Sequence, residues 1–432
     1  MIDRVSSLLA LFYSAAFLFG SSFATQGPSV VPVVSMTART VLRALHISSV
    51  AGTAASWSSA QPIRRVVVVG GTHGNEYTGV WCIKALDRNP PTDYPSLDVS
   101  TLLGNPKAHY ANKRFIHSDL NREFVGEKLA SGRRAESLRP EAGSTEDCPE
   151  DGEEFIVDGE GTPRTAESIR AQEVDQLLGP KLGDQNPAAD LVVDLHSTTS
   201  NMGTTIIIVE GDQLMARAAA YVLHECGGEE GDTRILMHCI PNRKERPNLA
   251  STARHGFTIE VGPVPQGVLR HDAVEKTQKA LMALFQFLQR SNEDADSIDQ
   301  HLKECYPTGK IPCYRSALSN MAGQMSSKIE WPVDDENPNF PALMIHKSVQ
   351  DRDFHSIRKG DALFVDLAGN IIPYDGSYGE EVQLMFVNEG GYYYSSSGTG
   401  IGVAVATEFD LEKGKLSPMT DEKVDTLSTF GN

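Results

Sequence analysis

The pattern of apolar and polar residues divides much of the chain into short buried strands and amphipathic helices. Val66–Val69 is a continuous apolar run, which favours a strand covered on both faces, as in parallel sheets. Further strands are predicted near residues 97–103, 190–195, 205–209 and 257–261. Helical periodicity predicts helices over residues 78–86, 166–178, 212–224 and 274–289. Because strands and helices alternate, we predict an α/β fold with a mixed, largely parallel sheet flanked by helices.

The pattern changes after the last of these helices. Short strands are predicted at residues 362–367, 381–387 and 400–406, separated by Gly, Asp and Asn, which indicates a small β-rich domain. Residues 138–163 are rich in Asp and Glu and poor in apolar side chains, which predicts a disordered insertion. We therefore expect a main domain at 63–292, a polar linker at 293–339, a β-rich domain at 340–418 and a tail at 419–432.

Residues 1–62 differ from the rest in composition. Leu8–Phe19 is apolar, follows Arg4 and precedes small residues, as in a signal peptide, but is too short for a confident membrane span. Residues 25–65 contain no Asp or Glu, carry four arginines and are rich in Ser, Ala and Thr, as organelle transit segments are. The alternative is a poorly ordered leader with Met36 as the true start. Both interpretations remain open.

Composition excludes some classes of function. With 40% hydrophobic and 22% charged residues, the 432-residue chain is typical of a globular protein with a sizeable core. A net charge of −18 argues against general nucleic-acid binding, although the acidic stretch at 136–160 supplies much of that charge. Six cysteines without a Cys-x-x-Cys pair disfavour a cysteine zinc finger or a dense disulfide framework.

Four residues near predicted strand ends suggest a metal site. His73 and Glu76 follow the first strand three residues apart, so a helical turn there would bring both side chains to one point. An imidazole nitrogen and a carboxylate oxygen suit zinc, and a catalytic zinc needs a third protein ligand. His196 follows another strand end, where ligands bind in open α/β sheets, and Glu260 is a carboxylate within an apolar strand. An isolated His-x-x-Glu is more often a helix cap, but these two additional residues favour the metal site.

In sequence the chain resembles the aspartoacylase and aminoacylase 3 family of zinc-dependent deacylases. The resemblance covers roughly residues 64–410 and leaves the leader and the acidic insertion unmatched. It rests on six stretches in the family's order: Gly-Gly-Thr-His-Gly-Asn-Glu (70–76), Asp-Leu-Asn-Arg (119–122), Arg-Ala-Gln-Glu (170–173), Asp-Leu-His-Ser-Thr-Thr-Ser-Asn-Met-Gly (194–203), Ile-Glu-Val-Gly-Pro-Val-Pro-Gln-Gly-Val-Leu-Arg (259–270) and Val-Asn-Glu-Gly-Gly-Tyr-Tyr (387–393).

The resemblance implies a zinc-carboxypeptidase-like fold and hydrolysis of an N-acyl amino acid to a carboxylate and a free amino acid. It implies one Zn²⁺ per subunit, held by His73, Glu76 and His196. Glu260 would activate the attacking water, and Arg114 would polarise the scissile carbonyl. The remaining implied site residues contact the substrate: Asn121 and Arg122 at its α-carboxylate, and Tyr392 from the C-terminal domain.

One departure from the family pattern concerns the substrate's side chain. Aspartoacylases carry an arginine ten residues before the glutamate base, associated with binding the acidic side chain, and ungapped counting places Ala250 there. Arg246 or Arg254 is the candidate substitute. N-acetyl-L-aspartate is the first expected substrate, and N-acyl aromatic or other neutral amino acids are the alternative.

The wider expectations follow from the same resemblance. The expected partner is a small anionic substrate and not nucleic acid. We expect no stable membrane association of the mature domain, and a homodimer is compatible with the sequence. The resemblance implies a cytoplasmic protein, whereas a targeting leader would imply an organelle or the secretory route. The rival from another class is a catalytically silent zinc-binding protein.

Overall fold

The computed structural model describes residues 61–126, 128–129, 156–157, 163–183, 185–227, 232–240, 242–317, 319–321, 324–326, 328–332, 334–337, 340–393 and 400–417. The predicted leader up to residue 60, most of the acidic insertion and the tail at 419–432 lie outside these residues. At the end of the insertion, β3 (Ile156–Val157) pairs with β4 (Pro163–Arg164), where we expected no regular structure. Every helix in the described part is too short or too polar to cross a membrane.

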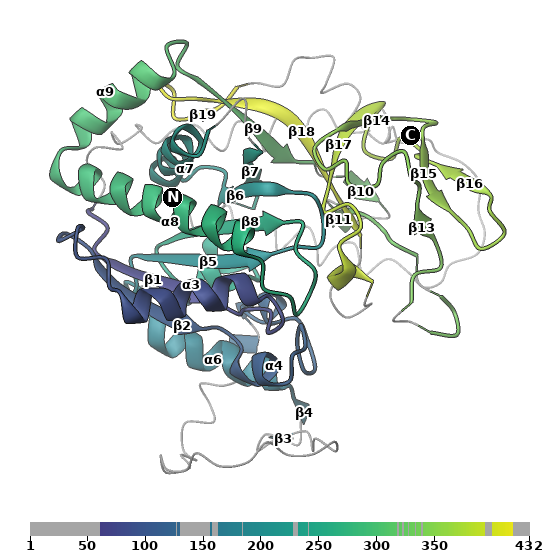
Figure 1. Cartoon of the computed structure of the whole chain (residues 1–432), viewed down its shortest axis with the longest axis horizontal. Coiled ribbons are helices and arrows are strands. Elements are labelled where there is room, and N and C mark those ends of the chain that lie inside the picture. The colour runs from purple at the N-terminus through teal and green to yellow at the C-terminus, as the bar shows by residue number, and fades with distance from the viewer. Residues whose placement is uncertain are drawn as a thin grey trace, which may run out of the picture. The chain divides into compact units, whose positions relative to one another are not determined.

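A mixed sheet organises the described residues (Figure 1). At one side four neighbouring strands run parallel, in the order β2, β1, β5 and β8. The next strand, β6, is antiparallel to β8, and β7 and β9 then run parallel to β6. The strands of this part are β1 (Arg65–Gly70), β2 (Asp98–Leu103), β5 (Leu191–Ser197), β6 (Gly203–Val209), β7 (Thr233–His238), β8 (His255–Gly262) and β9 (Lys310–Ser316).

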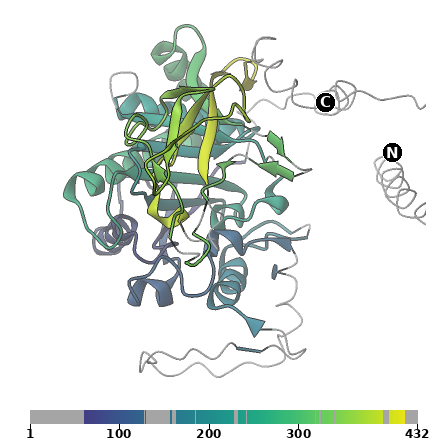
Figure 2. The same cartoon turned by 90° about the vertical axis from the view of Figure 1, so that its right-hand side faces the viewer.

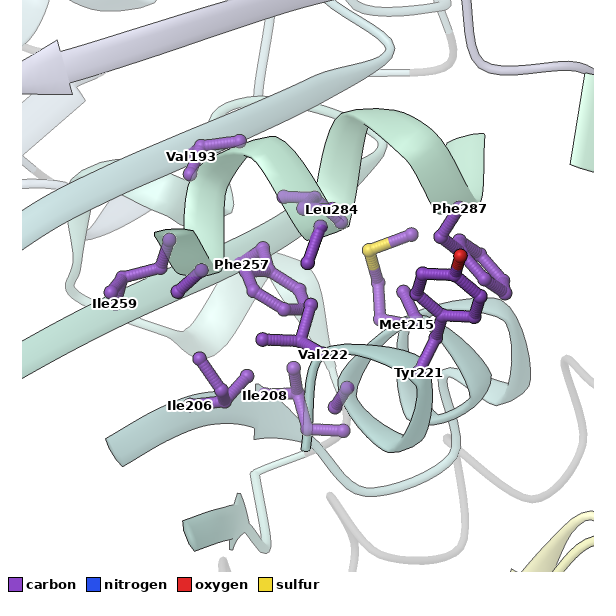
Figure 3. Packing of buried hydrophobic residues seen from close by; sticks show 14 of the residues in the cluster. Val193, Ile206, Ile208, Met215, Tyr221, Val222, Phe257, Ile259, Leu284 and Phe287 are labelled. Carbon is purple, nitrogen blue, oxygen red and sulfur yellow. The ribbon is translucent and has the colours of Figure 1, made fainter. Parts of the chain in front are cut away.

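Both faces of this sheet are covered, and the valines of β1 show how. Val66 and Val68 face a large core cluster that includes residues of α3, α7, α8 and α9, whereas Val67 and Val69 face a second cluster with α6. Figure 3 shows part of the first cluster, to which β8 contributes Phe257 and Ile259, α7 contributes Val222 and α8 contributes Leu284. The helices are α3 (Tyr77–Arg88), α4 (Pro106–Tyr110), α6 (Ala166–Leu178), α7 (Gln213–Glu225), α8 (His271–Glu293) and α9 (Ala295–Cys305).

The C-terminal β-rich part continues the same sheet. β18 (Ile401–Asp410) is antiparallel to β9 over seven residue pairs, and β17 (Glu381–Met385) and β14 (Ser356–Arg358) extend the order outward (Figure 1). In Figure 2 this part, in yellow-green, faces the viewer. The short strands β12 (Lys328–Ile329) and β19 (Lys415–Leu416) also pair with β18. The separate small sheets consist of β10 (Ser319–Met321) with β11 (Gln324–Ser326), and β13 (Met344–Ile345), β15 (Ala362–Val365) and β16 (Ile371–Pro373).

The predicted fold class is confirmed: a mixed sheet flanked by helices, with a C-terminal antiparallel β domain. The segment at 293–339, expected as a polar linker, contains α9 and β9. We missed α9 because only Ile298 and Leu302 of it are buried, too few for a clear periodic pattern. β7 was also not predicted, although its residues Ile235–Met237 are buried.

Candidate metal centre and catalytic site

The turn after β1 places His73 and Glu76 at the carboxyl end of the parallel strands. Gly71 has a positive φ of 70°, and a Cβ there would lie 2.9 Å from both Leu103 and Val80, so glycine is required for this turn. The Glu76 N–H donates to the His73 carbonyl at 3.1 Å, which closes a single turn just before α3. The expected helical turn is therefore present, and α3 itself begins one residue after Glu76.

His196 reaches the same point from the end of β5, the strand beside β1. Nδ1 of His73 lies 2.6 Å from Oε1 of Glu76, and Nδ1 of His196 lies 2.9 Å from Oε2. All three side chains are buried, and their candidate ligand atoms lie within 4.8 Å of one another. These three residues, predicted from spacing and strand ends, therefore form one compact cluster.

Each imidazole has a second carboxylate on its other side. Nε2 of His73 lies 3.1 Å from Oδ1 of Asp119, and Nε2 of His196 lies 2.9 Å from Oδ2 of Asp194. A metal-binding histidine usually donates its other ring N–H to such a group, which fixes the tautomer and frees the first nitrogen for the metal. The donor set and its support thus fit a metal ion bound through the two Nδ1 atoms and the Glu76 carboxylate.

The negative charges of the carboxylates in this cluster and the positive charge of protonated imidazole compensate one another. Burial raises the pKa of Glu76, but the two neighbouring imidazoles outweigh it and hold that pKa well below its usual range. Burial lowers the pKa of His196, yet the carboxylates of Asp194 and Glu76 raise it well above its usual range. A cluster of this kind favours a bound cation, because two histidines and three carboxylates then share one positive centre.

Glu260 lies next to His196 on the neighbouring strand. β8 pairs with β5 in a register that sets Glu260 opposite His196, and the side chain is buried. Burial raises the pKa of Glu260, and Glu76 and Glu389 raise it further while His196 opposes them. A carboxylate at this point can accept and release a proton directly beside the metal cluster.

Arg114 is buried on the other side of Glu76. Its Nη1 donates to Oε1 of Glu76 at 3.1 Å, and its Nη2 lies 3.6 Å from Oδ2 of Asp119. Burial lowers the pKa of Arg114, but Asp119, Glu76 and Glu389 outweigh it and raise the pKa above its usual value. A Cβ on Gly391 would lie 2.6 Å from Nη1, so a glycine lets the C-terminal domain approach this guanidinium.

Asn121 and Arg122 lie in the 3₁₀ helix η2 (Leu120–Arg122) beside the cluster. Nδ2 of Asn121 is 3.3 Å from Nε2 of His196, and its Oδ1 accepts from the Leu249 N–H at 2.9 Å. Nη1 of Arg122 donates to the Asn121 carbonyl at 3.1 Å, which leaves other guanidinium donors at a partly exposed position. Both residues are therefore adjacent to the metal cluster, as expected from the Asp-Leu-Asn-Arg stretch.

Tyr392 comes from the C-terminal domain, in the 3₁₀ helix η5 (Gly390–Tyr392). Cζ of Arg114 lies 5.8 Å from the centre of the Tyr392 ring, and Nζ of Lys328 lies 4.0 Å from it. The same domain contributes Glu389, whose Oε2 accepts from the Thr199 N–H at 2.8 Å and whose Oε1 lies 4.0 Å from Nη1 of Arg114. The C-terminal domain is therefore part of the site.

The two candidate arginines differ in position. Arg254 lies at the amino end of β8, where it donates to Gln61 Oε1 at 2.6 Å and lies 3.6 Å from Asp190. The metal cluster is at the opposite end of the strand, beside Glu260 and roughly 20 Å along the chain from Arg254 at about 3.3 Å per residue. Arg246 follows η3 (Arg243–Glu245), and the Pro247 carbonyl beside it accepts from the Phe124 N–H at 3.1 Å. The segment that contains Arg246 therefore lies beside the loop of Asn121 and Arg122, because the Leu249 N–H also donates to Asn121 Oδ1.

Sequence reasoning missed four residues of this site as individual candidates. Asp194 could have been found, because residues two apart on a strand share a face and His196 is two residues further on. Asp119 lies in the Asp-Leu-Asn-Arg stretch, but nothing local pairs it with His73. Glu389 and Lys328 reach the site only through the packing of the C-terminal domain.

Ala250, in η4 (Leu249–Ser251), is buried in the second core cluster, so its side chain is used in packing.

Known proteins are similar to this chain in sequence and in fold. Mouse aspartoacylase is 32% identical over 339 residues, which cover 77% of this chain and 90% of the relative. An N-acyl-aromatic-L-amino acid amidohydrolase (carboxylate-forming) from Xenopus laevis is 31% identical, with 77% and 92% covered. The crystal structure of murine aminoacylase 3 matches with a TM-score of 0.61 at 26% identity, covering 81% of this chain and 97% of that one.

Two family models match the chain directly. The AstE/AspA barrel-sandwich hybrid domain matches residues 324–399. The succinylglutamate desuccinylase/aspartoacylase catalytic domain matches residues 62–147 and 155–288, and these matches together with the relatives show that the chain belongs to the succinylglutamate desuccinylase/aspartoacylase family.

Proposed function

We propose that the protein is a zinc-dependent amidohydrolase that cleaves N-acyl amino acids into a carboxylate and a free amino acid. The observation that carries this proposal is the buried cluster of His73, Glu76 and His196 with Glu260 and Arg114 beside it. Two imidazole nitrogens and one carboxylate oxygen are a usual protein ligand set of a hydrolytic zinc site. The names of the relatives, aspartoacylase and N-acyl-aromatic-L-amino acid amidohydrolase, support the same reaction class.

A zinc ion fits this cluster, because a carboxylate of Asp119 or Asp194 lies within 3.1 Å of each Nε2, while both Nδ1 atoms face Glu76. When bound, zinc would make water acidic enough to ionise near neutral pH and would polarise a carbonyl oxygen. The His73 and His196 rings would each keep a proton on Nε2 and present Nδ1 to the ion. That division of roles follows from the carboxylate behind each ring.

Glu260 would act as the proton carrier. Hydrolysis adds a hydroxyl group to the acyl carbon and breaks the carbon–nitrogen bond, so one proton must move from water to the departing amine. Glu260 is the carboxylate beside His196, and its burial keeps bulk water from competing for that proton. The same side chain would accept the proton first and deliver it afterwards.

Arg114 would stabilise the negative charge that develops on the acyl oxygen. Glu76 and Asp119 already hold its guanidinium in place, so little reorganisation is needed when the charge forms. Arg122 and Asn121 would bind the substrate's α-carboxylate, since a planar guanidinium can grip a carboxylate with two hydrogen bonds. Tyr392 would contact the substrate from the C-terminal domain.

N-acetyl-L-aspartate is the substrate we propose first. A specific observation keeps N-acyl aromatic or other neutral amino acids as a second candidate: Ala250 occupies the position where aspartoacylases carry an arginine, and it is buried in the core. The structural match to murine aminoacylase 3 adds to that second candidate.

The test is hydrolysis by the full chain supplied with zinc. N-acetyl-L-aspartate, N-acetyl-L-glutamate and N-acetyl-L-phenylalanine are compared by measuring the free amino acid released. We expect turnover of at least one, with about one zinc per chain by elemental analysis. Zinc binding without turnover of any of the three would instead support a catalytically silent zinc-binding protein.

A further inference from the structure

A polar loop carries part of the proposed catalytic site without regular structure of its own. Residues 111–119 lie between α4 and η2, where the chain forms turns and bends but neither helix nor strand. We call these residues the Arg114 loop, because Arg114 lies near its start; Asn121 and Arg122 follow it in η2. Since such a segment lacks the hydrogen-bond pattern of a helix or strand, another part of the molecule must satisfy its partly buried N–H groups.

Glu167 holds the middle of the Arg114 loop. Its Oε1 accepts a hydrogen bond from the Ile116 N–H at 2.7 Å, and its Oε2 accepts from the N–H groups of His117 and Ser118 at 3.1 and 3.2 Å. Three consecutive backbone donors therefore converge on one carboxylate. Oε1 also accepts from Nδ2 of Asn105 at 3.0 Å. Hydrogen bonds to a carboxylate are roughly twice as strong as those between neutral groups, so Glu167 fixes this part of the loop.

The contacts of Glu167 go beyond those of a helix-capping carboxylate. It lies in the first turn of α6, where the helix dipole favours any carboxylate. A glutamate with that role alone can stay in solvent, whereas Glu167 is buried and both its oxygens accept from the Arg114 loop. The start of α6 adds two contacts: the Ser118 hydroxyl donates to the Thr165 hydroxyl at 3.1 Å, and the Ala166 N–H donates to Nδ1 of His117 at 3.1 Å. The loop is thus docked on the start of α6.

The two ends of the docked segment differ in their support. Arg114 is two residues before Ile116, and its side chain donates to Glu76 at 3.1 Å, so the position of its backbone decides how its guanidinium lies in the site. Asn121, beyond the other end, is also tied to a different segment, because its Oδ1 accepts from the Leu249 N–H at 2.9 Å. Loss of the bonds at Ile116 should therefore disturb Arg114 more than Asn121.

We propose that Glu167 is a positioning residue of the hydrolytic reaction: through the Arg114 loop it holds Arg114 where negative charge develops on the acyl oxygen. This inference rests on the proposed function and adds a residue to the same site. Glu167 would touch neither the zinc nor the substrate, so its effect passes through the loop. Its loss should lower kcat and leave KM and zinc content close to the wild type, because the metal ligands and the Asn121 anchor come from other segments.

The experiment measures kcat, KM and zinc content of the full chain carrying Glu167→Gln. The substrate is whichever of N-acetyl-L-aspartate, N-acetyl-L-glutamate and N-acetyl-L-phenylalanine the wild type hydrolyses fastest. Glutamine keeps the size of the side chain, but its NH₂ group cannot accept from a backbone N–H. We expect kcat to fall by about 10–100-fold, since a displacement of about 1 Å can cost about 10²-fold. Glu167→Asp keeps a carboxylate on a shorter side chain; it should lose less activity, and it is the second variant if Glu167→Gln does not fold.

Hydrogen exchange of the backbone amides tests the positioning independently of activity. In Glu167→Gln the amides of residues 116–118 should exchange about tenfold faster or more, because they lose their acceptor, while those of β1 and β5 keep the wild-type rate. Glu173→Gln is the matched control: Glu173 lies on the same helix, but its side chain is exposed and binds Arg170 at 2.8 Å. That variant should change neither kcat nor the exchange of the loop.

The outcomes separate positioning from a general structural role. A structural role alone would lower the melting temperature and speed exchange in all strands alike, with an unchanged kcat of the zinc-loaded protein. That result, or faster exchange of the loop without a fall in kcat, would overturn the inference. A rise in KM with unchanged kcat would also overturn it, because the effect would then pass through Arg122 and not Arg114. Absence of wild-type turnover on all three substrates would instead refute the proposed function, and with it any catalytic role of Glu167.

Discussion

Replacing Asp194 by asparagine tests whether the carboxylate behind His196 supports metal binding. Oδ2 of Asp194 lies 2.9 Å from Nε2 of His196, and Oδ1 accepts from the Thr72 hydroxyl at 2.7 Å. With the charge present, the ring proton stays on Nε2 and Nδ1 is free for the metal. The asparagine side chain lacks that charge. In one orientation its NH₂ group faces Nε2, which favours the tautomer of His196 with the proton on Nδ1 and so blocks the nitrogen that would bind the metal.

The magnitude follows from these contacts. Losing such a supporting group usually weakens metal binding by about 10–100-fold, or roughly 1.4–2.7 kcal/mol. The amide can also turn its oxygen toward His196, because the Thr72 hydroxyl can accept as well as donate. We therefore expect the lower end of that range, about a tenfold rise in the Kd for zinc.

Zinc affinity is measured by competition with a chelating dye on metal-depleted protein, independently of activity. Asp190→Asn is the matched control, because Asp190 lies at the other end of the same strand and its Oδ1 binds Arg65 at 2.8 Å. That variant can lower the melting temperature but should keep the wild-type zinc affinity. Equal weakening in both variants, or none in Asp194→Asn, would refute the supporting role of Asp194.

Two further predictions concern catalysis and binding. Glu260→Gln should keep bound zinc while kcat falls by about 10²-fold or more, because the amide cannot take a proton from water; elemental analysis and initial rates check this, and wild-type kcat would exclude the role. Arg122→Lys should raise KM by about tenfold or more for acidic and neutral N-acyl amino acids alike, since all share the α-carboxylate; a loss confined to one class would contradict it.

The sequence predicted the metal cluster well because its members sit at the ends of strongly apolar strands. Val66–Val69 marks β1 and the buried run at 190–195 marks β5, so the polar residues directly after them stand out. Strand pairing then brings these ends together without any further information. The same reasoning placed Glu260, a carboxylate in an otherwise apolar strand.

Sequence reasoning failed where tertiary packing brings distant segments together. Lys328 and Glu389 lie in short elements of the C-terminal domain, and no local pattern indicates that they approach Arg114 or Tyr392. The choice between Arg246 and Arg254 also needed the strand register, which places Arg254 at the amino end of β8. Counting along the chain cannot show at which end of a sheet a loop residue lies.

The continuous sheet also limits how the enzyme could be re-engineered. Because β9 pairs with both β7 and β18, an exchange of the C-terminal domain with that of a relative would have to begin in the turn before Lys310. An exchange starting near residue 340 would match a foreign β18 to the native β9 over seven residue pairs. Removal of everything after α8 would leave β7 as a bare edge with buried Leu236 and Met237, which invites aggregation. The catalytic part and the C-terminal β-rich part are therefore not separable modules in this protein.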